Sequence, residues 1–327
     1  MFNDLLKADD NDVETVIICS GGGALGLWQW TVLMELAKRF KISMICGCSA
    51  GSLNAFAFAK GLYMETTNLY NQVFQSNAKE IFSEGILRLK NGNLDVNWFK
   101  AIPTALFKSK SIKGLMGNGP LLETLKELNK MKPGFAYGVD FGFNATDMKT
   151  GKVIDFWPED FEDDDNLMKG VTASATIPVL LPLVHGVKSK KGTFDHLGDG
   201  GVAEGTPMAM MFRRMKPGRK YRVISINCNT KDMVEADQLD NIFQIAQRTM
   251  AIMMNQVYQG DLDVTMLKNE ILKDNPGKDG MIFAPVHIIE CSDPHGSLNF
   301  TQQSYISMID SARRDVQKFC AEYSQAV

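Results

Sequence analysis

The sequence predicts a three-layer α/β/α fold with a mainly parallel central sheet and a helical C-terminal region. A β-branched run at 13–19 enters a glycine-rich loop at 20–26, after which apolar residues recur at helical spacing between 30 and 37. A second strand-like run at 42–46 follows directly. This strand–helix–strand order is typical of a βαβ unit, which requires parallel strands with a helix on one face of the sheet. From about residue 236 onward the pattern is mainly helical.

The other elements are expected in the following order. Residues 61–135 are expected to form helix and loop, because glycines interrupt them repeatedly. A strand pair is expected from 137 to 145 and from 153 to 157, and the acidic run 159–165 is expected to be a solvated loop. Tyr221 to Asn227 predicts another buried strand, and two apolar helical stripes start at Ile242 and Tyr305. We therefore expect a core over 13–230 and a mainly helical region over 236–327 that packs on it without forming an independent domain.

Composition and charge exclude several classes of protein. With 327 residues, 45% hydrophobic and 22% charged, the chain has an ordinary globular composition, and its net charge of −3 argues against a general nucleic-acid binder. No basic start followed by an apolar stretch, and no bilayer-length apolar run, is present in the sequence. The default expectation is a cytoplasmic protein, and secretion by a machine that reads no N-terminal signal stays open. The six cysteines predict neither a disulfide framework nor a metal site.

The most informative local pattern is Gly47-Cys48-Ser49-Ala50-Gly51. It lies between the strand-like run 42–46 and a run of small and apolar residues from 52 to 60 that predicts a helix. A Gly-x-Ser-x-Gly in that context is the signature of a nucleophile elbow, in which small residues permit a sharp turn that exposes the serine at a helix N-terminus. There the helix dipole favours the negative charge of a reaction intermediate. An ordinary serine in a glycine-rich turn is the alternative.

The glycine-rich loop at 20–26 is a candidate for an oxyanion hole. Acyl transfer by serine needs backbone donors aimed at the developing oxyanion, and glycines let N–H groups approach a small anion closely. A phosphate-binding loop is the competing interpretation. The sequence lacks the Gly-Lys-Ser/Thr ending of a P-loop, and Gly21–Gly26 does not fit the spacing of a dinucleotide-binding fingerprint.

The base that would activate Ser49 is harder to predict. The sequence has four histidines, none of them in an obvious triad context, although His295 could end a loop near the site. Asp199 instead lies in a glycine-flanked turn, where its carboxylate could approach another backbone. A partly desolvated aspartate has a raised pKa and accepts a proton more readily. An Asp-Gly-Gly alone is also a common structural turn.

Taken together, several motifs resemble one family. They are Ser20-Gly21-Gly22-Gly23-Ala24-Leu25-Gly26, Gly47-Cys48-Ser49-Ala50-Gly51, Asn144-Ala145-Thr146-Asp147 with Thr150-Gly151, Ala173-Ser174-Ala175-Thr176-Ile177-Pro178 and Asp199-Gly200-Gly201. In this order they are similar to the patatin-like phospholipases over roughly residues 13 to 230. The resemblance implies a serine–aspartate dyad, with Ser49 as nucleophile and Asp199 as base, that cleaves acyl esters of phospholipids or neutral lipids.

The same resemblance assigns further roles. It implies that the oxyanion hole is formed by backbone N–H groups of the loop Gly21, Gly22, Gly23 and Ala24, centred on Gly22 and Gly23. Gly47, Gly51, Gly200 and Gly201 support the two catalytic turns. No cofactor and no metal are implied. The expected partner is a lipid substrate, reached through peripheral membrane contact, and the need for a protein activator stays open.

Two positions depart from the family pattern. Leu25 replaces a basic residue that many members carry, and Gly205 stands where an asparagine is usual. Neither change removes a member of the dyad. Two other function classes stay open. One is an acyltransferase or α/β-hydrolase with a Ser–His pair, and the other is a binding protein that keeps the fold without catalysis. Lys188, Lys190 and Lys191, expected in a loop, are hypothesised to steer the site toward anionic headgroups.

Overall fold

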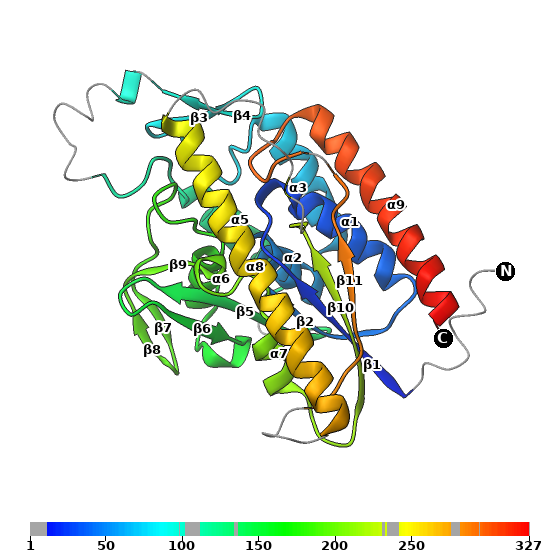
Figure 1. The fold of residues 1–327 in the computed structure, drawn as a ribbon. Helices are drawn as coiled ribbons and strands as arrows, with labels where there is room; N and C mark the ends of the chain where they lie inside the picture. The colour runs from blue at the N-terminus through cyan, green and yellow to red at the C-terminus, as the bar shows by residue number, and fades with distance from the viewer. Residues whose placement is uncertain are drawn as a thin grey trace.

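The computed structural model describes residues 12–97, 99–101, 112–133, 137–230, 233, 242–275, 282–293 and 295–326. Its centre is a mixed sheet (Figure 1) with the strand order β11-β10-β1-β2-β5-β6, in which β9 also pairs with β5. The strands are β1 (Val13–Cys19), β2 (Ile42–Gly47), β5 (Asp140–Asp147), β6 (Lys152–Phe156), β9 (Leu197–Asp199), β10 (Lys220–Asn227) and β11 (Val286–Glu290).

The sheet is mainly parallel, as the βαβ pattern predicts. The pairings of β10 with β11, of β1 with β10 and β2, and of β2 with β5 are all parallel, whereas β6 and β9 run antiparallel to β5. The predicted strands at 13–19, 42–46 and 221–227 are confirmed to within one residue. These central strands are almost entirely buried, because helices cover both faces of the sheet.

Helices form the two outer layers of the molecule. They are α1 (Gly26–Ala37), α2 (Ala50–Ala59), α3 (Tyr63–Ser76), α5 (Gly119–Met131), α6 (Asp164–Ser174), α7 (Met208–Arg214), α8 (Ile242–Asp274) and α9 (Gln302–Ala326). In Figure 1, α8 crosses in front of the strands, whereas α1 and α9 lie together at the other side.

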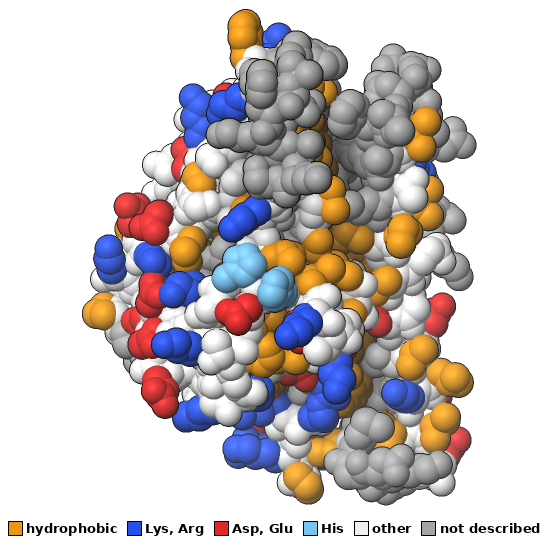
Figure 2. Space-filling model, turned by 90° about the vertical axis from the view of Figure 1, so that its left-hand side faces the viewer, with side chains coloured by type: hydrophobic (Ala, Val, Ile, Leu, Met, Phe, Trp, Pro, Cys, Tyr) orange, Lys and Arg blue, Asp and Glu red, His pale blue; other side chains and the backbone are white. Residues whose placement is uncertain are grey.

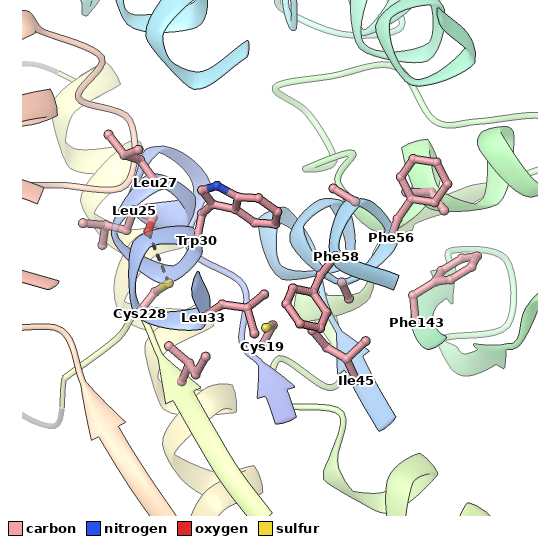
Figure 3. Close-up of a cluster of buried hydrophobic side chains, with 14 of the residues drawn as sticks. Cys19, Leu25, Leu27, Trp30, Leu33, Ile45, Phe56, Phe58, Phe143 and Cys228 are labelled. Carbon is pink, nitrogen blue, oxygen red and sulfur yellow. Dashed lines mark hydrogen bonds between the residues drawn. The ribbon is translucent and has the colours of Figure 1, made fainter. Parts of the chain in front are cut away.

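Two hydrophobic clusters, one on each face of the sheet, confirm the three-layer architecture. Alternate residues of β1 point to opposite faces: Ile17 and Cys19 join the larger cluster, and Val16 and Ile18 join the smaller one. The larger cluster packs α1, α2, α3, α5, α6 and α9 against the sheet, and Figure 3 shows part of it around Trp30 and Leu33. The smaller cluster packs α7 and Leu262 of α8 against the opposite face.

Several elements differ from the expectation. Leu87–Lys90 (β3) and Asn93–Val96 (β4) form a hairpin whose turn residues, Asn91 and Gly92, both have positive φ. This is the geometry that Asn-Gly favours in two-residue hairpins. A second hairpin joins β7 (Val187–Ser189) to β8 (Gly192–Phe194), so the expected lysine loop is a strand pair.

The acidic run and the C-terminal region also differ from the expectation. The run 159–165 contributes to a 3₁₀ turn, η3 (Pro158–Asp160), and to the start of α6, whose first turn Asp163 caps by accepting the N–H of Asn166 at 2.7 Å. Strand β11 adds an edge to the central sheet from the region expected to be mainly helical. None of the helices in the described part of the chain is both long and apolar enough to cross a membrane.

Candidate active site

Ser49 occupies a strained elbow between β2 and α2. Its φ of 54° and ψ of −128° lie in a region that residues with a side chain rarely adopt, at a cost of about 1–3 kcal/mol. The two motif glycines permit the turn through close packing. A Cβ on Gly47 would lie 2.2 Å from the carbonyl oxygen of Gly51, and one on Gly51 would lie 2.2 Å from that of Cys19. The turn therefore presents the serine at the carboxyl end of a central parallel strand.

The carboxylate of Asp199 lies within hydrogen-bonding distance of the Ser49 hydroxyl. Ser49 Oγ donates to Asp199 Oδ2 at 2.7 Å, and both residues are buried, with Asp199 fully so. The other carboxylate oxygen, Oδ1, accepts the N–H of Gly201 at 2.8 Å. The structure thus brings together two residues that are 150 positions apart in the sequence, as the dyad hypothesis expects.

Burial changes the acidity of this carboxyl group. Desolvation raises the pKa of Asp199 from 3.8 to about 7, and hydrogen bonds from Ser49, Gly201 and Cys48 lower it in part. Two further carboxyl groups near the same turn behave similarly. Burial raises the pKa of Glu204 to about 7 and that of Asp261 to about 6. A carboxylate with a pKa near neutrality is a competent general base for a serine hydroxyl.

The glycine-rich loop lies beside this pair, and its four candidate donors differ in how they are bonded. The N–H of Gly21 donates to the carbonyl oxygen of Gly205 at 3.2 Å, and that of Ala24 donates to Ser297 at 2.6 Å. Neither Gly22 nor Gly23 donates its N–H to any residue that the structure describes. Gly22 and Gly23 are therefore the two members of the loop that could donate to an oxyanion without losing an existing bond.

The motif Ala173-Ser174-Ala175-Thr176-Ile177-Pro178 supports both members of the pair, a role that the sequence alone did not assign. The N–H of Ser49 donates to Ser174 Oγ at 3.1 Å, and the N–H of Asp199 donates to the carbonyl oxygen of Thr176 at 2.8 Å. Strand β5 adds a third support, because Ala145 pairs with Asp199 in the β5–β9 ladder. One segment thus holds the serine backbone and the aspartate backbone in a fixed relation.

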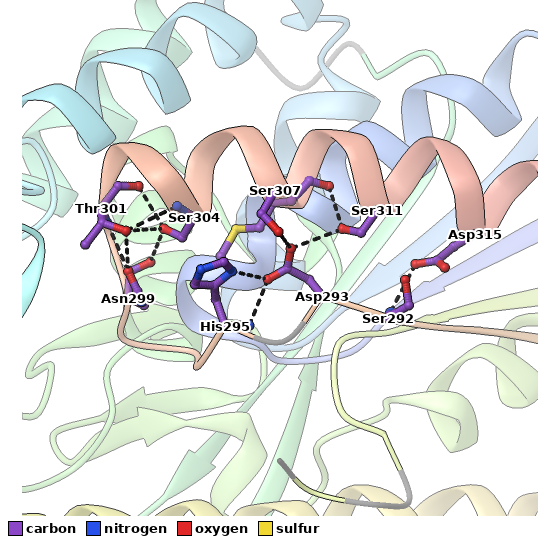
Figure 4. Close-up of polar contacts among 10 residues, drawn as sticks. Ser292, Asp293, His295, Asn299, Thr301, Ser304, Ser307, Ser311 and Asp315 are labelled. Carbon is purple, nitrogen blue, oxygen red and sulfur yellow. Dashed lines mark hydrogen bonds and ion pairs between the residues drawn. The ribbon is translucent and has the colours of Figure 1, made fainter. Parts of the chain in front are cut away.

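No histidine in the described part of the chain hydrogen-bonds to Ser49. The ring Nδ1 of His295 instead lies 2.8 Å from Asp293 Oδ1, and the same carboxylate accepts hydrogen bonds from Ser307 and Ser311 of α9 (Figure 4). His185 and His196 contact each other, with ring centroids 5.2 Å apart. Figure 2 shows two neighbouring histidine side chains beside a group of hydrophobic ones. The hydroxyl of Ser49 is paired with Asp199 and not with an imidazole.

The two departures from the family pattern have structural explanations. Leu25 is 6% exposed and belongs to the hydrophobic cluster of Figure 3, next to Cys228, so its position is part of the core. At Gly205 a Cβ would lie 1.5 Å from the ring of Tyr258, which comes from α8. Any side chain at 205 would therefore overlap Tyr258, a residue that sequence reasoning missed because no local pattern links two positions so far apart.

Asp261 is a second residue of α8 that sequence reasoning missed. Its Oδ2 accepts the N–H of Gly205 at 2.8 Å and that of Thr206 at 3.3 Å. The segment that follows Asp199 is therefore tied to α8. Within the described residues there is no group of three or more histidine, cysteine, aspartate or glutamate side chains that could hold a metal ion.

The lysine hypothesis involves the β7–β8 hairpin. Lys191 Nζ forms an ion pair with Asp160 at 2.7 Å, so its charge is partly neutralised within the protein. Lys190 lines a cavity of about 650 Å³ together with Asp140 and Glu159. Steering by these lysines stays a prediction, to be checked by reversing all three charges and measuring binding to anionic vesicles.

The chain is similar in sequence to one protein family and in fold to two solved structures. No curated protein matches the chain. Among solved structures, VipD from Legionella pneumophila is 13% identical with a TM-score of 0.42, over 95% of this chain and 67% of that one. Human GIVD cytosolic phospholipase A2 is 12% identical with a TM-score of 0.42, over 99% of this chain and 62% of that one.

The model of the family described as Patatin-like phospholipase matches residues 17–212. This range is more than half of the chain, and it includes the glycine-rich loop, the serine elbow and the turn that carries Asp199. The chain therefore belongs to the patatin-like phospholipase family.

Proposed function

We propose that this protein is a lipid acyl hydrolase that cleaves carboxylic esters through an acyl-enzyme on Ser49, with Asp199 as the general base. Family membership supports lipid acyl hydrolysis in general. The single observation that supports the finer mechanism is the 2.7 Å hydrogen bond between Ser49 Oγ and Asp199 Oδ2 at a strained elbow. The proposed substrate is a phospholipid or another acyl-ester lipid presented at a membrane surface.

The first step forms the acyl-enzyme. Asp199 accepts the hydroxyl proton as Ser49 Oγ attacks the ester carbonyl carbon, and the carbonyl π electrons move to oxygen. Protonated Asp199 then donates that proton to the leaving alcohol oxygen as the ester C–O bond breaks. Water attacks the acyl-enzyme by the same sequence, with Asp199 again accepting and returning a proton, and the fatty acid is released.

The oxyanion formed in each step needs donors. Gly22 and Gly23 supply free N–H groups in a loop that neighbouring segments hold in place, since Ala24 donates to Ser297 and Gly21 donates to Gly205. A preorganised donor of this kind lowers the barrier by about 3 kcal/mol, because it is aligned before charge develops. Helix α2 begins beside Ser49, and the positive end of its dipole also stabilises the negative charge of the oxyanion.

Fatty-acid release from mixed phospholipid vesicles tests this function. Wild type is expected to release fatty acid, and Ser49→Ala and Asp199→Asn are expected to lose at least about 10³-fold in rate while remaining folded by circular dichroism. Ser189→Ala, in the β7–β8 hairpin, is the matched control and should keep wild-type activity. Full activity of Asp199→Asn would refute its role as base, and inactive wild type would refute the proposed function.

A further inference from the structure

Tyr258 is a buried tyrosine whose hydroxyl has no hydrogen-bond partner among the described residues. Its side chain is 2% exposed and lies on the inner side of α8. Buried tyrosine hydroxyl groups normally find a partner. The hydroxyl of the half-buried Tyr70 is bonded differently, because it donates to Asn54 Oδ1 at 2.7 Å. Because no hydrogen bond to a described residue occupies it, the Tyr258 hydroxyl is available to donate to a bound ligand.

The surroundings of the Tyr258 hydroxyl place it at the active site. A Cβ on Gly21 would lie 2.3 Å from that hydroxyl oxygen and 3.1 Å from the Cβ of Ser49. A Cβ on Gly201 would lie 2.5 Å from the same hydroxyl and 3.0 Å from Asp199 Oδ1. The hydroxyl thus shares one small space with the nucleophile, the base and the glycine-rich loop.

Two contacts fix the tyrosine in this position. Its ring lies against Gly205, where a Cβ would come within 1.5 Å, so the absence of a side chain at 205 makes room for the ring. One helical turn further along α8, Asp261 accepts the N–H groups of Gly205 and Thr206. The glycine that departs from the family pattern and the tyrosine that fills its space therefore form one structural unit.

We propose that Tyr258 is a further catalytic residue, whose hydroxyl donates a hydrogen bond to the carbonyl oxygen of the bound ester and to the oxyanion that this oxygen becomes. The proposal rests on the lipid acyl hydrolase function proposed above. Burial raises the pKa of Tyr258 well above 10, so the hydroxyl keeps the proton that it needs in order to donate a hydrogen bond. Its hydroxyl supplements the backbone N–H groups of Gly22 and Gly23 as a further hydrogen-bond donor.

The tyrosine takes part without transferring its proton. When Ser49 Oγ bonds to the carbonyl carbon and Asp199 takes the serine proton, the carbonyl electron pair moves to oxygen, and the Tyr258 O–H···O hydrogen bond strengthens. When the carbonyl re-forms and the alcohol leaves with the proton from Asp199, that hydrogen bond weakens again. A donor that binds the transition state more tightly than the ground state raises kcat and changes KM little.

Tyr258→Phe tests the proposal, because it removes the hydroxyl and keeps the ring against Gly205. We expect kcat to fall about 100-fold with KM and the melting temperature nearly unchanged. The loss should be similar for a p-nitrophenyl ester and an alkyl ester, since the stabilised oxygen is the carbonyl oxygen. Tyr305→Phe, on α9 and packed against Phe74, is the matched control and should be fully active.

Each other outcome would overturn the proposal. Unchanged kcat in Tyr258→Phe would leave the tyrosine a packing residue, and a loss confined to alkyl esters would make it a donor to the leaving group. Higher activity in Tyr258→Ala than in wild type would identify the ring as a plug. Labelling of wild-type Ser49 by a fluorophosphonate separates these results from a failure of the proposed function. If the proposed function is wrong, wild type would be both inactive and unlabelled, and both proposals would be overturned.

Discussion

Asp199 is fully buried and accepts a hydrogen bond from Ser49, the serine of the strained elbow. This environment determines the pH range in which Asp199 could act as the proposed base. Burial raises its pKa to about 7. The carboxylate form needed for proton abstraction therefore forms only as the pH approaches neutrality. For an exposed aspartate the same change would be complete by about pH 5.

The first prediction concerns activity against pH. We expect kcat/KM for a soluble ester to rise about tenfold per pH unit below pH 7 and to level off above it, because activity follows the fraction of ionised Asp199. The measurement is a rate profile from pH 4.5 to 9 with a substrate that does not titrate. A profile already flat at pH 5 would contradict the assignment of Asp199 as the base.

The second prediction concerns stability: activity is expected to rise with pH, whereas the contribution of Asp199 to stability is expected to fall. Because the pKa of Asp199 is higher in the folded than in the unfolded state, its protonation stabilises the fold at low pH, and this contribution is lost as pH rises through about 7. Asp199→Asn removes the buried charge and should raise the free energy of unfolding by about 2–4 kcal/mol at pH 8, and by much less at pH 4.

Urea denaturation of wild type and Asp199→Asn at both pH values checks this prediction. Asp263→Asn in α8 provides the control, because Asp263 is exposed and the substitution removes no buried charge. Equal effects at pH 4 and pH 8 would mean that the change in stability comes from packing and not from the buried charge.

At the scale of elements, short connections position the glycine-rich loop and Ser49 at the carboxyl ends of β1 and β2, which lie side by side in the sheet, and Asp199 ends β9, which pairs with β5. The sequence predicts this part well, because the β-branched runs and the glycine motifs at their ends are local signals. It does not reveal the support from α6, because the hydrogen bond between Ser49 and Ser174 spans 125 residues. The β3–β4 hairpin does have a local signal, because Asn91-Gly92 is typical of a two-residue hairpin turn.

The third prediction addresses that support. Ser174→Ala leaves the buried N–H of Ser49 without an acceptor at a strained elbow, so we expect a loss of about 1–3 kcal/mol in the free energy of unfolding. We also expect the rate to fall about tenfold, because the nucleophile is less well positioned. Parallel denaturation and esterase assays, with Ser189→Ala as control, measure both effects. Wild-type behaviour in both assays would show that the elbow holds without this acceptor.

At the scale of the whole molecule, the site is completed by residues beyond the range that the family model matches. Tyr258 and Asp261 of α8 contact the turn after Asp199, and the carbonyl of Ser297 accepts the N–H of Ala24 in the glycine-rich loop. Sequence reasoning placed a helical region here and missed these contacts, because each joins positions far apart in the chain. It also missed β11, a five-residue strand, Val286–Glu290, that follows a 33-residue helix.

The fourth prediction follows from this arrangement. A chain ending at residue 230 would lose β11, so the apolar strand β10 would become an exposed edge, and α8 would no longer cover the smaller hydrophobic cluster. We expect such a chain to aggregate or to show no cooperative unfolding transition by circular dichroism, in agreement with a C-terminal region that is not an independent domain. A folded and active fragment would contradict this expectation.

The most direct test of the account is covalent labelling of the nucleophile, followed by mass spectrometry of intact and digested protein. We expect a fluorophosphonate to modify wild type at one residue, Ser49, to leave Ser49→Ala unmodified, and to react much more slowly with Asp199→Asn, because labelling requires a serine activated by its base. Modification of a different residue, or equal labelling rates for wild type and Asp199→Asn, would contradict the Ser49–Asp199 mechanism.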